Sequence, residues 1–211
     1  MNKVYKVFPG GKFKVLTFSY DDGKIEDRRL VKLFNKFNLK ATFNLNTGII
    51  DPAIRIPQEE WPELYKGHDI AVHTFTHPTM IRLNDYNALR EILDDKDNLE
   101  KIFKRPIYGL AYPNGSYDNR IVDIAKSVGI KYARVTNDKY AATKAAEAYA
   151  ANADGPMLIG DENGFSMPED YMCWVPTCHH NHNLIDFGKK FMALTKKQYL
   201  YMMYVLSLIH I

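Results

Sequence analysis

The stretch FKVLTFSYDDG, residues 13–23, organises this chain. β-branched and aromatic residues at 13–18 predict a buried strand, and two adjacent carboxylates, Asp21 and Asp22, stand just beyond it. The following segment, 29–37, predicts a helix because its apolar residues recur at helical spacing, at Leu30, Leu33, Phe34 and Phe37. The chain therefore opens with a strand, a polar loop and a helix.

The same alternation continues. Further strands are predicted at residues 41–45, 69–73, 107–111 and 131–135, with helices at 84–103 and 118–128. The starts of successive strands are separated by about one strand–helix unit, which favours parallel strands with crossover helices. The pattern predicts an α/β protein, either an open doubly wound sheet or a barrel. No glycine-rich nucleotide-binding motif follows the first strand. In a barrel, functional side chains gather at the carboxyl ends of the strands.

The second half of the chain is less regular. Residues 139–153 are alanine-rich and predict a helical insertion, and residues 154–169 predict a loop. A further helix is expected at 184–194 and a further strand at 198–205. No linker marks a second domain, so residues 1–211 are interpreted as one domain.

Composition narrows the class of protein. The chain has 211 residues, of which 46% are hydrophobic and 25% charged, as in a globular protein with a sizeable core. A net charge of +3 gives no reason to expect a nucleic acid or an anionic membrane as partner. Residues 1–18 lack the features of a signal peptide, no apolar run is long enough to span a membrane, and two cysteines make no disulfide framework. We therefore expect a cytoplasmic protein. Its oligomeric state is not predicted.

Metal-binding side chains follow two of the predicted strands. His73 and His77 stand at the end of the third strand, and spacing of four places both imidazoles on one side of the segment. Asp21 and Asp22 alone would fit an ordinary polar loop. Two imidazoles and one carboxylate with open positions for water, however, are the ligands of a catalytic rather than a structural zinc site. The two strand ends together therefore favour a metal site.

The fourth strand ends in Ala111-Tyr112-Pro113-Asn114-Gly115. Proline and glycine predict a tight turn, and an exposed tyrosine beside a polar site could stack on a sugar ring. Taken alone, the segment fits a simple turn before a helix capped by Asp118.

Taken in order, these three strand ends resemble the polysaccharide deacetylases of the NodB-homology type, carbohydrate esterase family four. Residues 19–23, Ser-Tyr-Asp-Asp-Gly, are similar to the first motif of that family, and residues 73–77, His-Thr-Phe-Thr-His, to the second. The resemblance covers roughly residues 13–135. It implies a distorted (β/α) barrel with about seven strands and a divalent metal, with zinc as the expected ion.

The resemblance also implies the roles of individual residues. Asp22, His73 and His77 would hold the metal, and Asp21 would be the general base in removal of N-acetyl groups from a saccharide. The backbone N–H of Asn114 would stabilise the oxyanion. From the aromatic turn, Tyr112 and Pro113 are expected to contact substrate.

The sequence departs from the family in two places. Ala111 stands where the third motif usually has an arginine that orients the base, which leaves Asp21 without that partner. The end of the chain, residues 206–211, lacks the expected glycine–histidine segment, and His210 is out of register with the expected histidine. We therefore expect that the last strand–helix unit is incomplete.

Residues 173–182 contain two cysteines and three histidines, which taken alone could form a second metal site. Their spacing matches no standard zinc finger, and the segment is similar to one that recurs in the same deacetylase branch. We therefore interpret it as a substrate-lining loop, in which Trp174 is an apolar wall and His179 or His180 the general acid. A loop of hydrogen-bonded histidines remains the alternative.

Other functions stay open from the sequence. The substrate is expected to be a saccharide or a small amide. Relatives with this fold hydrolyse cyclic imides or ureides, and both the missing arginine and the absence of a secretion signal are compatible with that chemistry. The departures are also compatible with a saccharide-binding pseudoenzyme that retains the metal.

Overall fold

The computed structural model describes residues 8–135, 165, 168, 170–179, 183–194 and 200–206, and it describes only the backbone of residues 179, 200–202 and 204–206. The insertion predicted at 139–153 and most of the loop predicted at 154–169 lie outside these residues. Among the described helices, none is long and apolar enough to cross a membrane.

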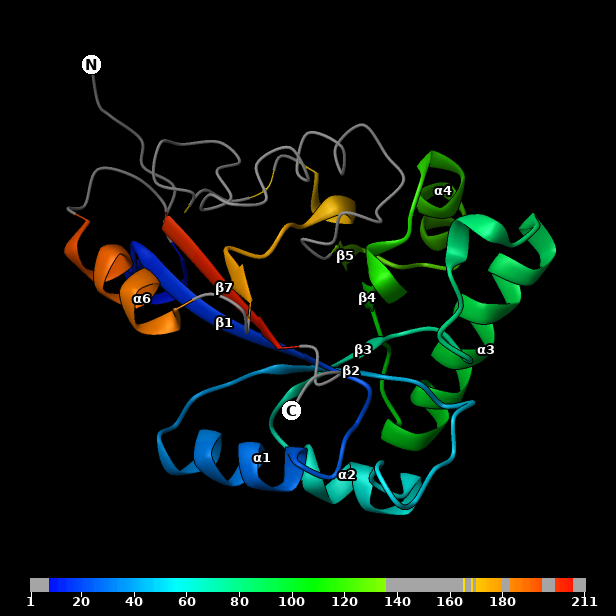
Figure 1. Ribbon diagram of the computed structural model, residues 1–211, viewed down its shortest axis with the longest axis horizontal. Coiled ribbons are helices and arrows are strands. Elements are labelled where there is room, and N and C mark those ends of the chain that lie inside the picture. The colour runs from blue at the N-terminus through cyan, green and yellow to red at the C-terminus, as the bar shows by residue number, and fades with distance from the viewer. Residues whose placement is uncertain are drawn as a thin grey trace.

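The described strands form one parallel sheet in the order β5-β4-β3-β2-β1-β7-β6. The sheet curls into part of a barrel (Figure 1), which confirms the predicted α/β barrel class. The strands are β1 (Lys14–Asp21), β2 (Thr42–Leu45), β3 (Asp69–Val72), β4 (Gly109–Ala111), β5 (Tyr132–Arg134), β6 (Cys178–His179) and β7 (Leu200–Leu206).

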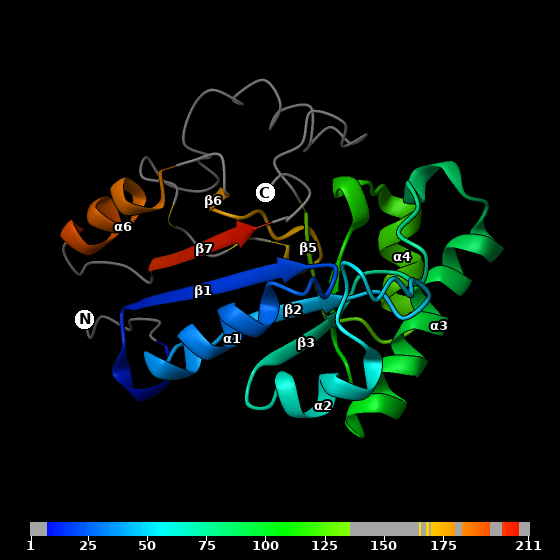
Figure 2. The ribbon, with the colours of Figure 1, turned by 60° about the horizontal axis from the view of Figure 1, so that its bottom comes forward.

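Helices α1 to α4 cover the outer side of the curled sheet, and α6 lies beside β7 and β1 (Figure 2). Their bounds are α1 (Asp27–Lys36), α2 (Trp61–Leu64), α3 (Asp85–Phe103), α4 (Asn119–Ser127) and α6 (Leu184–Ala193). Side-chain caps begin three of them: Asn84 accepts from the Asn87 N–H, Asp118 from the Ile121 N–H, and Asn183 from the Ile185 N–H. The predicted Asp118 cap is thus confirmed.

Apolar residues between the helices and the sheet form the main core. Strand and helix side chains meet there with no more than 1% of their surface exposed, at Phe43, Ile70, Leu110, Ile92, Leu99 and Ile121. Burial on this scale fixes each strand against its covering helix, and thereby fixes where each strand ends.

Candidate active site

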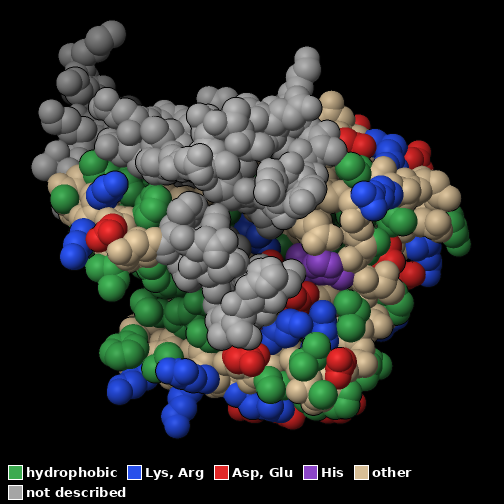
Figure 3. All heavy atoms as spheres, in the orientation of Figure 1, with side chains coloured by type: hydrophobic (Ala, Val, Ile, Leu, Met, Phe, Trp, Pro, Cys, Tyr) green, Lys and Arg blue, Asp and Glu red, His purple; other side chains and the backbone are tan. Residues whose placement is uncertain are grey.

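The polar residues at the ends of β1 and β3 come together at the carboxyl edge of the sheet. Parallel strands end at the same edge, so Asp21 at the end of β1 and Asp22 just after it lie near His73 after β3. Asp21, Asp22 and His73 are each at most 5% exposed. In the space-filling view, histidine side chains reach the surface beside acidic and basic ones (Figure 3).

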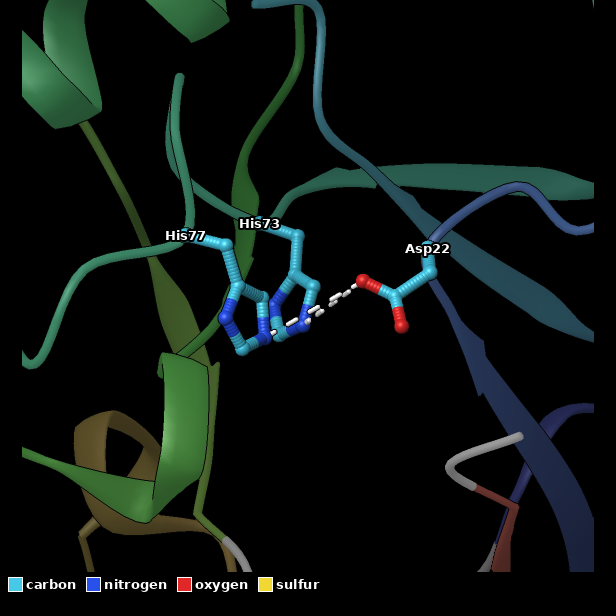
Figure 4. Close-up of side chains that lie close together, drawn as sticks. All are labelled: Asp22, His73 and His77. Atoms are coloured by element: carbon cyan, nitrogen blue, oxygen red, sulfur yellow. Dashed lines mark ion pairs between the residues drawn. The ribbon is translucent and has the colours of Figure 1, made fainter. Parts of the chain in front are cut away.

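Three donor atoms converge at this edge. The Asp22 Oδ1 lies 4.0 Å from Nε2 of His73 and 4.0 Å from Nε2 of His77. All three donors lie within 4.8 Å of one another, and Figure 4 shows both rings turned toward the carboxylate. The structure therefore brings together the three residues that the sequence predicts as ligands.

The histidines are prepared to act as ligands. The Nδ1 of His73 lies 2.7 Å from the carbonyl oxygen of Ala111, so Nδ1–H donates there and leaves the Nε2 lone pair facing the cluster. Burial, reinforced by the nearby His73, lowers the pKa of His77 below its ordinary value and favours the neutral imidazole. Neutral imidazoles and a carboxylate fit a divalent cation such as Zn²⁺.

Asp21 has a separate environment. Its Oδ1 accepts hydrogen bonds from the Asn44 amide at 2.7 Å and from Arg134 Nη2 at 2.5 Å. Burial alone would raise the pKa of Asp21, but Arg134, His73 and Asn44 outweigh burial and hold this pKa below its ordinary value. The carboxylate is therefore ionised, and its Oδ2 faces the cluster, 3.9 Å from His73 Nε2.

Arg134 corrects the expectation that Asp21 lacks an arginine partner. Arg134 ends β5, is 3% exposed, and stands in register with Ala111 on the neighbouring strand β4. The guanidinium thus comes from β5, whereas the family motif would place the arginine at position 111 on the neighbouring strand β4. A single arginine in the apolar 131–135 strand was the signal available in the sequence.

Two more residues absent from the sequence prediction contact the ligands. Arg55 forms a partly buried ion pair with Asp22. Asp95, on α3, accepts from the backbone N–H of His73 and from both the N–H and the hydroxyl of Thr47. Burial raises the pKa of Asp95 to about 7, although these hydrogen bonds oppose the rise.

The turn after β4 differs in part from the prediction. Tyr112 is 0% exposed and stacks on Tyr117, with ring centroids 5.1 Å apart, and Pro113 is also buried. The expectation of an exposed tyrosine that stacks on a sugar is therefore wrong, because this ring packs in the core. Asn114 is exposed at the tip of the turn with φ 55°, and its proposed role stays a prediction.

The segment after residue 170 is placed only in part. Trp174 runs beside β5, packs against Met203, and contacts the rings of Tyr132 and Tyr171. The backbone of His179 pairs with Val205 in the sheet, whereas its side chain and all of His180 lie outside the described residues. The roles predicted for these three residues therefore stay predictions.

The fold and the site together define a class of protein. A curled parallel sheet carries an Asp–His–His donor set that could hold a divalent cation, with a separate ionised carboxylate at the same carboxyl edge. The sequence model of the family described as Polysaccharide deacetylase matches residues 9–133, more than half of the chain. The chain belongs to this family.

Solved structures agree with this assignment. The Streptococcus pyogenes deacetylase PplD, solved in complex with acetate, is 27% identical over 62% of this chain and 58% of its own, with a TM-score of 0.58. A polysaccharide deacetylase from Bacillus cereus shares the fold at 19% identity over 82% of this chain and 50% of its own, with a TM-score of 0.61. The chain thus spans 58% and 50% of the length of these two proteins. No curated protein matches it.

Proposed function

We propose that this chain is a metal-dependent hydrolase that removes N-acetyl groups from an N-acetylated saccharide. The observation that carries the proposal is the convergence of Asp22, His73 and His77 beside the ionised Asp21. Family membership supports a saccharide amide as substrate. The acetate bound by PplD is the acid that hydrolysis of an acetamide releases, which supports the acyl group.

The reaction adds water across the amide C–N bond: the carbonyl carbon gains the hydroxyl and leaves as acetate, and the nitrogen leaves as an amine. A divalent cation held by Asp22, His73 and His77 would supply Lewis-acid polarisation of the carbonyl and activation of water. Asp21 takes the proton of the attacking water at Oδ2, because Arg134 and Asn44 occupy its Oδ1.

Two further groups complete the proposed mechanism. The backbone N–H of Asn114, in the exposed turn after β4, would stabilise the oxyanion that forms on the carbonyl oxygen. The amine needs a proton as it leaves, and His179 or His180 would donate it. Together these groups would serve both ends of the bond that breaks.

The alternative of a saccharide-binding pseudoenzyme has lost one of its two arguments. It rested partly on the absence of an arginine for Asp21, and Arg134 makes that ion pair. The imide or ureide hydrolase rested partly on the same absence, so the N-deacetylase is the proposal that we favour.

Acetate release from chitooligosaccharides and peptidoglycan fragments tests the proposal. We expect release that stops on chelation and returns with added zinc. Asp21→Asn, which keeps the shape of the side chain, should slow release by about 100-fold or more while zinc binding persists. Asp85→Asn serves as the matched control, since Asp85 is an exposed partner of Arg120. Release that resists chelation, or no release from any substrate, would contradict the proposal.

A further inference from the structure

The segments that carry the proposed ligands have unusual backbones. Asp22, Thr74 and His77 have φ values of 76°, 65° and 58°, in the left-handed region that a residue with a Cβ seldom adopts. Such conformations persist where surrounding contacts hold them. The Asp22 N–H donates to the Asn44 carbonyl, and side-chain contacts to the backbones of Asp22 and Thr74 come from two residues outside the ligand set, Asn46 and Arg55.

Asn46 holds the turn after β3. It follows β2 and is 1% exposed, and its amide nitrogen donates to the carbonyl oxygens of His73 at 2.6 Å and Thr74 at 3.0 Å. Its amide oxygen accepts from Arg55 Nη1 at 3.0 Å. One buried amide thus connects the histidine turn to the arginine.

Arg55 holds the segment after β1. The same Nη1 donates to the Asp22 carbonyl oxygen at 2.5 Å, and Nη2 lies 3.3 Å from the Asp22 Oδ1. The shorter contact is the one to the backbone. Arg55 therefore acts mainly on the conformation of Asp22, and less on the charge of its carboxylate.

The loop that carries Arg55 is attached to the segment it holds. The Ile56 N–H donates to the Gly23 carbonyl at 2.9 Å, the Ile25 N–H donates to the Ile54 carbonyl at 3.2 Å, and Lys24 and Arg55 form a β-bridge. These backbone contacts fix the position of Arg55 relative to the segment that carries Asp22.

We propose that Asn46 and Arg55 are positioning residues of the cation site, which fix the Asp22 backbone against the His73–Thr74 turn so that the donors are in place before a cation binds. This inference rests on the cation site of the proposed function. Neither residue touches substrate or the reacting atoms in that scheme.

The charge of Arg55 would have the opposite effect on cation binding from its hydrogen bonds, so an experiment can separate the two. A guanidinium near a bound cation repels it, so a purely electrostatic Arg55 would weaken binding and its removal would strengthen binding. Asn46 carries no charge, so its replacement isolates the hydrogen bonds. Lysine at position 55 keeps the charge and loses the planar pair of donors.

The test measures zinc affinity by competition with a chromophoric chelator for the wild type, Asn46→Ala, Arg55→Lys and Arg55→Ala. We expect all three variants to bind zinc about 10 to 100 times more weakly, the usual effect of removing a partner that orients a ligand. Arg28→Ala is the matched control, because among the described residues the Arg28 side chain pairs with the exposed Glu60, and the zinc affinity of this variant should equal that of the wild type.

Other outcomes would overturn the inference. Wild-type affinity in both Asn46→Ala and Arg55→Lys would show that the hydrogen bonds do not position the site, and tighter binding by Arg55→Ala would show that charge dominates. The urea midpoint of each chelated variant identifies any loss of zinc affinity that comes from unfolding. If a variant unfolds, Arg55→Lys decides whether the hydrogen bonds position the site, because it changes the chain least.

A second readout needs no metal. Amide hydrogen exchange at residues 74–77 of the chelated protein should be faster in Asn46→Ala than in the wild type, and unchanged exchange would overturn the inference. If the wild type bound no zinc, the proposed function would fail, while the exchange experiment would still decide whether Asn46 holds the turn.

Discussion

Asp21 and Asp22 are adjacent in the sequence, yet each contacts a different arginine. Arg134 binds the carboxylate of Asp21, and Arg55 binds mainly the backbone of Asp22. Because Asp22 is in the left-handed region and Asp21 ends β1, the two side chains diverge. Two like charges can therefore occupy one edge and serve different purposes, as the proposed division into ligand and base requires.

The contribution of the Asp21–Arg134 ion pair to the stability of the fold can be tested by substitution. Arg134→Ala leaves the Asp21 charge buried without its partner, so the free energy of unfolding of the chelated protein should fall by about 3 to 5 kcal/mol. Asp21→Asn combined with Arg134→Ala removes the uncompensated charge and should recover most of that loss. Urea unfolding of the wild type, the two single variants and the double variant forms a double-mutant cycle. Equal stability of Arg134→Ala and the double variant would contradict the coupling between the two residues.

The ligand residues could be predicted, whereas their partners could not. Asp22, His73 and His77 follow strands, and parallel strands end at one edge whatever the exact shape of the sheet. The partners of Arg134 depend on how far the sheet curls, which no local pattern records. A tyrosine before proline and glycine is typical of an exposed turn, whereas the structure packs the Tyr112 ring on Tyr117 in the core.

At the scale of elements, the loop after β2 packs closely against the turn after β3. The Gly48 N–H donates to the Phe75 carbonyl at 2.9 Å, and a Cβ on Gly48 would lie 2.5 Å from that oxygen. Such a distance forces the backbone to move. The loop after β2 can therefore pack this closely against the turn that carries His73 and His77 because residue 48 is a glycine.

Gly48→Ala tests this close approach. We expect lower stability in urea unfolding by about 1 to 3 kcal/mol, together with weaker zinc binding as the turn shifts. Gly188→Ala is the matched control, because Gly188 lies inside α6 and its Cβ would meet no atom within 4 Å. Its replacement should stabilise the chain by about 0.5 to 1 kcal/mol. Equal effects of the two substitutions would contradict the role of Gly48.

Element length explains part of what the sequence predicts. The long helix α3 and the strands β1 and β7 each supply enough residues for a pattern. Strands β4 and β5 have three residues each, and the sequence predicts them through the longer runs 107–111 and 131–135. The sequence does not predict the two-residue strand β6 or the four-residue helix α2. Tertiary packing, rather than local preference, forms such short elements.

At the scale of the molecule, the curl of the sheet creates the site. Strands β1 and β5 are four places apart in the sheet, which in a flat sheet would separate them by about 19 Å. Arg134 on β5 nevertheless reaches Asp21 on β1. The pair therefore both requires and stabilises the barrel-like closure, and this is why inspection of single segments could not reveal it.

Asp27 makes the stability of the whole fold depend on pH. It is 0% exposed at the start of α1, and among the described residues its Oδ2 accepts from the Tyr65 hydroxyl while its Oδ1 has no partner. Burial raises the pKa of Asp27 from 3.8 to about 7. The folded chain thus binds this proton more tightly than the unfolded chain. Its contribution to stability is complete below pH 3.8 and is lost as pH rises through about 7.

Asp27→Asn should remove this dependence. Between pH 5 and pH 8, the wild type should lose on the order of 2 to 3 kcal/mol more than the variant in urea unfolding of the chelated protein. The variant should equal the wild type at pH 5 and exceed it at pH 8. Tyr65→Phe is the opposing control: it removes the hydrogen bond that favours the charged carboxylate, so the loss should grow. Because Asp95 also has a raised pKa and adds a similar slope, the informative quantity is the difference between profiles, and parallel profiles for the wild type and Asp27→Asn would contradict the assignment.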